Sequence, residues 1–88
     1  MMEDKDKLCY EIVKIIEDNV HIDVDMTDDD DYLDLFFVSD LGADSLNVVE
    51  IVMECETKYD VVVSTEEVLD LKTIGDLIEL IYNKISSK

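Results

Sequence analysis

The most informative stretch of the sequence is Asp40-Leu41-Gly42-Ala43-Asp44-Ser45-Leu46. Gly42 supplies backbone freedom just before a run with helical periodicity, and Asp44 stands where a carboxylate caps the free N–H groups of a first helical turn. Ser45 then becomes the first residue of the helix, with its hydroxyl directed outward. Taken alone, the stretch predicts a capped helix start, and a functional interpretation depends on the residues around it.

The helix that follows is expected to cover residues 45–59. Its apolar residues fall into two neighbouring stripes at helical spacings. One stripe is Val48, Val52, Cys55 and Tyr59, and the other is Leu46, Val49 and Met53. Two stripes exceed what one core face requires, while the acidic residues Glu50, Glu54 and Glu56 exclude a helix enclosed on all sides. We therefore expect part of the second stripe to be exposed for a functional reason.

Three further helices are predicted outside this central one. Residues 4–20 carry one apolar stripe, formed by Leu8, Ile12, Ile15, Ile16 and Val20. Serine and threonine followed three residues later by an acidic residue are typical of capping boxes. Such pairs, Ser64 with Glu67 and Thr73 with Asp76, place a short helix at residues 64–71 and a last helix at 73–85. The predicted fold is all-α, a small bundle of three longer helices plus one short helix, in a single domain of residues 1–88.

Residues 21–40 are rich in aspartate, which is a poor residue for helix interiors. We expect a long loop there, held to the core by Leu35, Phe37 and Val38, with room for a short helical turn. Residues 61–63 have β propensity, but the sequence offers no partner strand nearby.

The composition restricts the class of protein. The 24 Asp and Glu against 7 Lys and Arg give a formal charge of −17. Such a surface excludes an ordinary nucleic-acid binder and argues against docking on anionic membranes, so that charged partners should be basic. Because 48% of the residues are hydrophobic, the chain is not an acidic disordered tail. No stretch is long enough to span a bilayer, and Cys9 and Cys55 are expected to be buried thiols, which suits a reducing cytosol or organelle matrix. We expect a cytoplasmic location.

Residues 40–46, followed by Val49-Glu50-Ile51-Val52-Met53, resemble the attachment motif of the acyl carrier proteins of fatty-acid synthesis. The resemblance extends to Tyr59-Asp60-Val61 and Thr73-Ile74-Gly75-Asp76 and covers nearly the whole chain. It implies that Ser45 receives 4′-phosphopantetheine from coenzyme A, transferred by a separate phosphopantetheinyl transferase that needs a divalent metal. It also implies that the thiol of this arm carries acyl groups as thioesters.

The resemblance further implies a partner-recognition face on the helix of residues 45–59. Its members would be Asp44, Leu46, Val49, Glu50, Met53 and Glu56. An apolar centre with acidic rims suits the basic surfaces of fatty-acid synthesis enzymes. Val48, Val52, Ile81 and Ile85 are expected in the core, some of them beside a cleft that shelters an acyl chain.

No catalytic activity is expected of the chain itself. Ser45 has no His or Lys base nearby in the sequence, and an unaided serine hydroxyl is a poor nucleophile. No catalytic pair, metal cluster or phosphate loop is apparent. We therefore expect a monomeric carrier that is a substrate of other enzymes.

Two alternatives stay open at this stage. A carrier of polyketide or aminoacyl groups shares the motif, although the residues flanking Ser45 look more like the fatty-acid type. A calcium-binding protein is the other alternative, because an EF-hand-like frame is occupied by Asp23, Asp25, Thr27, Asp29, Asp31 and Asp34. Against it, Asp28 occupies the position that requires glycine, and Asp34 replaces the bidentate glutamate.

Overall fold

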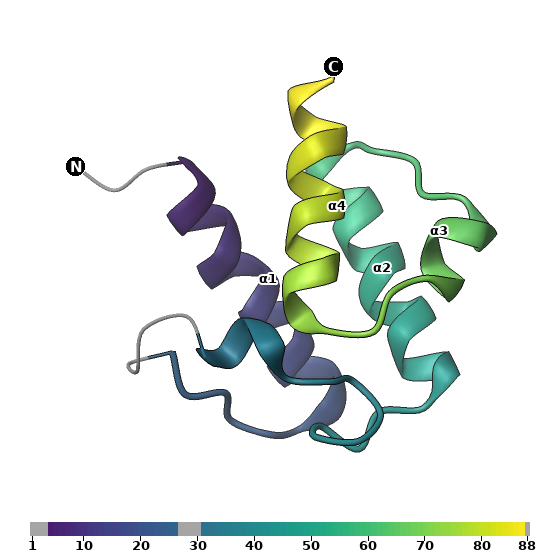
Figure 1. The fold of residues 1–88 in the computed structure, drawn as a ribbon. Helices are drawn as coiled ribbons and strands as arrows, with labels where there is room; N and C mark the ends of the chain where they lie inside the picture. The colour runs from purple at the N-terminus through teal and green to yellow at the C-terminus, as the bar shows by residue number, and fades with distance from the viewer. Residues whose placement is uncertain (1–3, 27–30, 88) are drawn as a thin grey trace.

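The computed structural model describes residues 4–26 and 31–87. Its helices are α1 (Asp4–Val20), α2 (Ser45–Tyr59), α3 (Thr65–Leu69) and α4 (Ile74–Ser86), with a 3-10 turn, η1 (Asp31–Asp34), between α1 and α2 (Figure 1). No strand occurs within these described ranges. The prediction of an all-α bundle with three longer helices and one short helix is confirmed.

The core lies where α1, α2 and α4 pack against one another. Each helix contributes apolar side chains that have almost no exposed surface, because its apolar stripe faces the other two. They are Ile12 and Ile16 of α1, Ile51, Val52 and Cys55 of α2, and Ile74, Leu77, Ile78 and Ile81 of α4. Of the residues expected in the core, Val48, Val52 and Ile81 are buried and Ile85 is partly buried. Ile51 belonged to neither predicted stripe of α2, yet it is fully buried.

The loop between α1 and α2 is tied to the start of α4. The N–H of Phe37 donates to the carbonyl of Lys72 at 3.0 Å, and the N–H of Ile74 donates to the carbonyl of Leu35 at 3.1 Å. Phe37 is buried and Leu35 packs against the core, as expected, and the predicted helical turn is η1.

The expectation that Val38 anchors this loop is wrong, since its side chain is 69% exposed. The N–H groups of Asp40 and Leu41 both donate to the carbonyl of Phe36, which closes a turn with Val38 at its outer side. Tyr32, in η1, is buried and was not predicted as an anchor.

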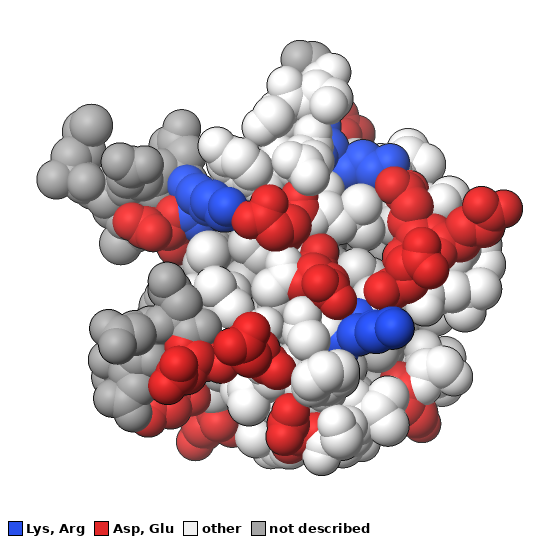
Figure 2. Space-filling model, viewed as in Figure 1, with Lys and Arg blue, Asp and Glu red and all other residues white. Residues whose placement is uncertain are grey.

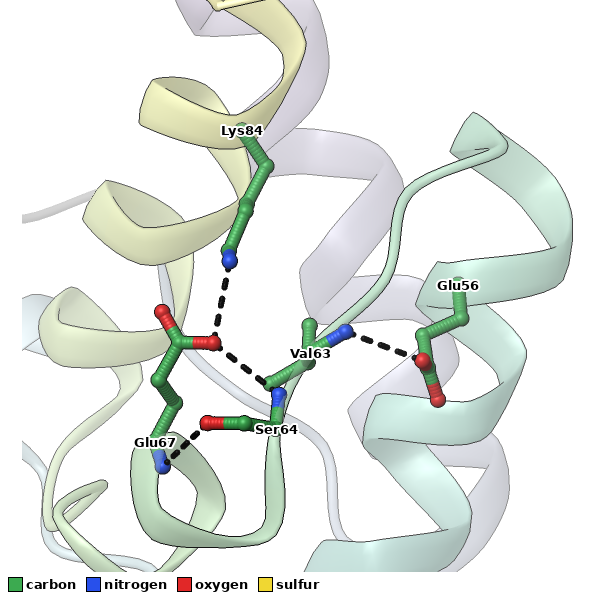
Figure 3. Close-up of polar contacts among 5 residues, drawn as sticks. All are labelled: Glu56, Val63, Ser64, Glu67 and Lys84. Carbon is green, nitrogen blue, oxygen red and sulfur yellow. Dashed lines mark hydrogen bonds and ion pairs between the residues drawn. The ribbon is translucent and has the colours of Figure 1, made fainter.

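The chain between α2 and α4 is organised by side-chain hydrogen bonds to the backbone. Ser64 Oγ accepts from the N–H of Glu67 at 3.1 Å, and Glu67 Oε1 accepts from the N–H of Ser64 at 2.9 Å, so the predicted capping box starts α3 (Figure 3). This helix ends at Leu69 rather than at Leu71, because the chain turns so that Leu71 packs against the core before Thr73 caps α4.

Candidate functional site

Ser45 is the first residue of α2 and is exposed to solvent. No hydrogen bond involving its hydroxyl is described with any residue of 4–26 or 31–87. The segment before it is held in place by the buried side chains of Leu41 and Ala43, and the N–H of Ala43 donates to the carbonyl of Phe37 at 2.8 Å. Gly42 lies between them with a φ of +67°, a conformation that glycine adopts without strain. The fold thus presents a free hydroxyl on a fixed backbone.

Asp44 forms the cap that starts α2 at this serine. Its Oδ1 accepts from the N–H of Asn47 at 2.8 Å, and Asn47 Oδ1 accepts from the N–H of Asp44 at 3.1 Å. The carboxylate is exposed, so one group both fixes the helix start and places a negative charge beside Ser45. The N-terminal end of a helix also favours a nearby phosphate, because its first N–H groups carry partial positive charge.

The second apolar stripe of α2 is exposed, as its surplus over the core requirement predicted. Leu46 is 64%, Val49 39% and Met53 57% exposed. Val49 and Glu50 each lie three or four residues from both Leu46 and Met53. The four side chains therefore share one side of α2. We call Leu46, Val49, Glu50 and Met53, together with Asp44, the α2 face. On the face shown in Figure 2, acidic side chains are spread widely, with a few basic groups between them.

Glu56 differs from the other residues expected on this face. It is half-buried, and its Oε2 accepts from the backbone N–H of Val63 at 3.0 Å (Figure 3). Its carboxylate therefore accepts a backbone hydrogen bond from the segment of residues 61–63, which is not paired in a sheet, and ties this segment to α2. A role of Glu56 in binding a partner stays a prediction.

A groove of about 220 Å³ lies between α2 and α3, next to the α2 face. It is lined by Val49, Val52, Met53, Glu56, Val63, Thr65, Val68 and Leu69. The contribution of α3 was missed from the sequence. The available signal was the pair of adjacent apolar residues Val68 and Leu69 in a short helix that also holds two glutamates, because so small a helix has little room to bury both.

A metal site requires a grouping of side chains that could hold the ion. No cluster of three or more potential metal-ligating side chains of the His, Cys, Asp and Glu types occurs in the described part of the chain. Of the calcium frame, Asp23, Asp25, Asp31 and Asp34 are exposed, while Thr27 and Asp29 lie outside the described residues.

Both cysteines are free thiols, as expected, but only one is fully buried. Cys55 has no exposed surface, whereas Cys9 is half-buried. Burial raises the pKa of the Cys55 thiol to about 12, so this side chain behaves as an apolar core group. Among the described helices, none is sufficiently long and apolar to cross a membrane.

Comparison with known proteins agrees with this arrangement. Residues 11–81 match the model of the family described as "Phosphopantetheine attachment site". The acyl carrier protein of Petrotoga mobilis is 33% identical over 82 residues, which cover 93% of this chain and 92% of that protein. The crystal structure of the acyl carrier protein from Thermotoga maritima superposes with a TM-score of 0.77 at 25% identity, covering 94% of this chain and 92% of that one.

A third similar protein is the acetyl actinorhodin acyl carrier protein from Streptomyces coelicolor. Its solution structure has a TM-score of 0.64 at 27% identity and covers 99% of this chain and 95% of that one. The fold and the family model together define a phosphopantetheine-dependent carrier domain. More narrowly, the chain belongs to the acyl carrier protein family.

Proposed function

We propose that Ser45 is the residue of this chain that carries 4′-phosphopantetheine, and that the protein serves fatty-acid synthesis. The observation that supports this most strongly is the exposed hydroxyl of Ser45, which makes no described hydrogen bond at the fixed start of α2. The other described serines differ. Ser64 uses its hydroxyl to cap α3, Ser39 lies in a turn, and Ser86 and Ser87 lie at the end of α4.

The chemistry asked of the chain is limited to supplying an acceptor hydroxyl. Ser45 Oγ bonds to the pantetheine-linked phosphorus of coenzyme A, the pyrophosphate P–O bond breaks, and adenosine 3′,5′-bisphosphate leaves. The hydroxyl proton passes to a base of the phosphopantetheinyl transferase, which also supplies the divalent metal ion. Once attached, the arm provides the terminal thiol that holds acyl groups as thioesters. The chain is then a substrate and carrier rather than a catalyst.

The α2 face is suited to recognition by partner enzymes. Leu46, Val49 and Met53 offer an apolar centre, and Asp44 and Glu50 add negative charge, which favours enzymes with basic docking surfaces. The groove between α2 and α3 has an apolar lining, so it is suited to shelter part of an acyl chain. We infer a monomer in the cytoplasm, and the two free thiols fit a reducing compartment.

A carrier of polyketide or aminoacyl groups is the second candidate. The likeness to the actinorhodin carrier supports it, whereas the residues after Ser45 favour the fatty-acid type. Loading by malonyl transferase followed by elongation with fatty-acid synthesis enzymes separates the two. Failure of elongation by every such enzyme, despite normal arm attachment, would favour the second candidate.

The attachment site is tested by mass spectrometry of the intact protein. The apo protein, incubated with coenzyme A, magnesium and a broad-range phosphopantetheinyl transferase, should gain the mass of one phosphopantetheine. Ser45→Ala should gain nothing, while the matched control Ser39→Ala should be modified fully. A folded Ser45→Ala protein that is still modified, or a wild type that never is, would refute the proposal.

A further inference from the structure

The lysines of this acidic protein are unevenly placed. Lys5 pairs with Glu79, and Lys84 pairs with Glu67 at 2.9 Å. Four other lysines, Lys7, Lys14, Lys58 and Lys72, are exposed, and none of them forms an ion pair with another described residue. Lys7, Lys14 and Lys58 line one surface groove, whereas Lys72 lies outside it.

The groove lies between α1 and the C-terminal half of α2 and has a volume of about 720 Å³. Its lining is completed by Tyr10, Glu11, Ile15 and Asp18. Tyr10 is 53% exposed, whereas Ile15 is 8% exposed and forms the floor of the lining. Three ammonium groups therefore stand around an aromatic and aliphatic surface.

The two acidic residues of the groove neutralise it only in part. Glu11 is half-buried, and its Oε1 accepts a hydrogen bond from the hydroxyl of Tyr59 at 2.9 Å. This bond joins α1 to α2. Glu11 and Asp18 offset two of the three lysine charges, so the formal net charge of the lining is +1. The groove, which we call the lysine groove, has the opposite charge from the molecule around it.

The lysine groove is continuous with the α2 face. A second hollow of about 480 Å³ is lined by Ile15 and Lys58, which it shares with the lysine groove, and by Met53, Glu54 and Thr57. Met53 also belongs to the exposed stripe of the α2 face. The second hollow therefore connects the α2 face to the lysine groove, so that one bound protein can contact both.

We propose that the lysine groove is a second contact for partner enzymes and binds a segment with acidic and apolar side chains that lies beside their basic docking surface. The inference rests on the proposed function. Acidic groups of the segment pair with Lys7, Lys14 and Lys58, and an apolar side chain packs on Tyr10 and Ile15. Two contacts of opposite sign fix the orientation of the partner, because a rotated partner would bring like charges together. A second copy of this chain and an anionic membrane are disfavoured as occupants, since both are repelled by the net charge of −17.

Charge reversal tests the proposal. If an acidic segment binds the lysine groove, replacing its lysines by glutamate should lower the affinity for the partner, whereas recognition of negative charge alone predicts that the affinity is unchanged or rises. The double variant Lys14→Glu/Lys58→Glu, carrying the arm, is titrated against each purified fatty-acid synthesis enzyme of the same organism. Affinity for at least one enzyme should fall about three- to tenfold, as expected from the loss of two exposed ion pairs. Lys72→Glu, an exposed position outside the groove, is the control and should leave affinity unchanged or raise it.

If a basic enzyme recognised only negative charge, the double variant would bind as tightly as the wild type or more tightly. That outcome with every enzyme would overturn the inference. The neutral variant Lys14→Gln/Lys58→Gln should lose affinity to a smaller extent, and circular dichroism confirms the fold of each variant. Complete modification of Ser45 in all of them, measured by mass, keeps this result separate from a failure of the proposed function.

Discussion

Replacing Asp44 by alanine separates the two roles of this residue, the helix cap and the charge beside Ser45. The substitution removes the acceptor that binds the N–H of Asn47 at 2.8 Å, while the hydrogen bond donated by its own N–H to Asn47 Oδ1 needs no Asp44 side chain. Loss of an N-cap costs about 1 kcal/mol of unfolding free energy. For a domain of this size the melting temperature should fall by about 4–8 °C.

Asp44→Asn is the matched variant, because asparagine keeps the acceptor oxygen and loses the charge. It should melt close to the wild type, whereas both variants should bind basic partners and the phosphopantetheinyl transferase more weakly. Thermal and urea unfolding followed by circular dichroism measure stability, and hydrogen exchange at the Asn47 amide reports the cap directly. If Asp44→Ala melted with the wild type and kept that amide protected, the capping argument would be wrong. If Asp44→Asn kept full transfer rate at low salt, the charge argument would fail.

Four further predictions follow from separate parts of the structure. The N–H of Ser64, and to a smaller extent Lys84, holds the pKa of the Glu67 carboxyl below its usual value of 4.5. The ionised carboxylate therefore stabilises the fold above that pH, and this contribution is lost as pH falls through the folded-state pKa. Acid unfolding of Glu67→Gln should depend less on pH than that of the wild type, and an unchanged profile would contradict this. At pH 8 a thiol reagent should modify Cys55 far more slowly than the other cysteine, as peptide mapping would show, and equal rates would exclude its burial. Gly75→Ala should destabilise the protein by about 1 kcal/mol in urea titration, because the new methyl would lie 3.0 Å from the carbonyl oxygen of Leu33 in η1 and this crowding outweighs the higher helix propensity of alanine; a gain in stability would refute that packing. Magnesium or calcium should raise the melting temperature by screening the net charge, and calorimetry revealing one tight stoichiometric calcium site would instead revive the calcium-binding hypothesis.

The helix boundaries were largely determined by the sequence itself. Both ends of α2 were predicted from its apolar spacing and from Asp44. The start of α4 was predicted from its capping box and its end from its apolar residues, each to within one residue. A capping box joins residues three positions apart, and the apolar stripe of a helix repeats every three or four residues. Both patterns can therefore be recognised within a short stretch of sequence. The exposure of Leu46 and Met53 also followed from the sequence, because a helix with two apolar stripes and three glutamates cannot bury both stripes.

The burial of some residues and the pairing of charges were decided only by the tertiary structure. Val38 is exposed because of how the turn at residues 37–41 packs, and its local spacing does not indicate this. Ile51 is buried between α1, α2 and α4, and its spacing of three from Val48 and four from Cys55 does place it on the core side of α2. Glu56 binds the N–H of Val63 because the chain turns back after α2. Lys7 and Lys14 lie far from Lys58 in the sequence and meet only because α1 packs beside α2. Contacts between distant segments depend on the whole packed arrangement, whereas a helix start depends on the residues next to it. The sequence could therefore predict that Ser45 begins α2, but it could not predict the lysine groove.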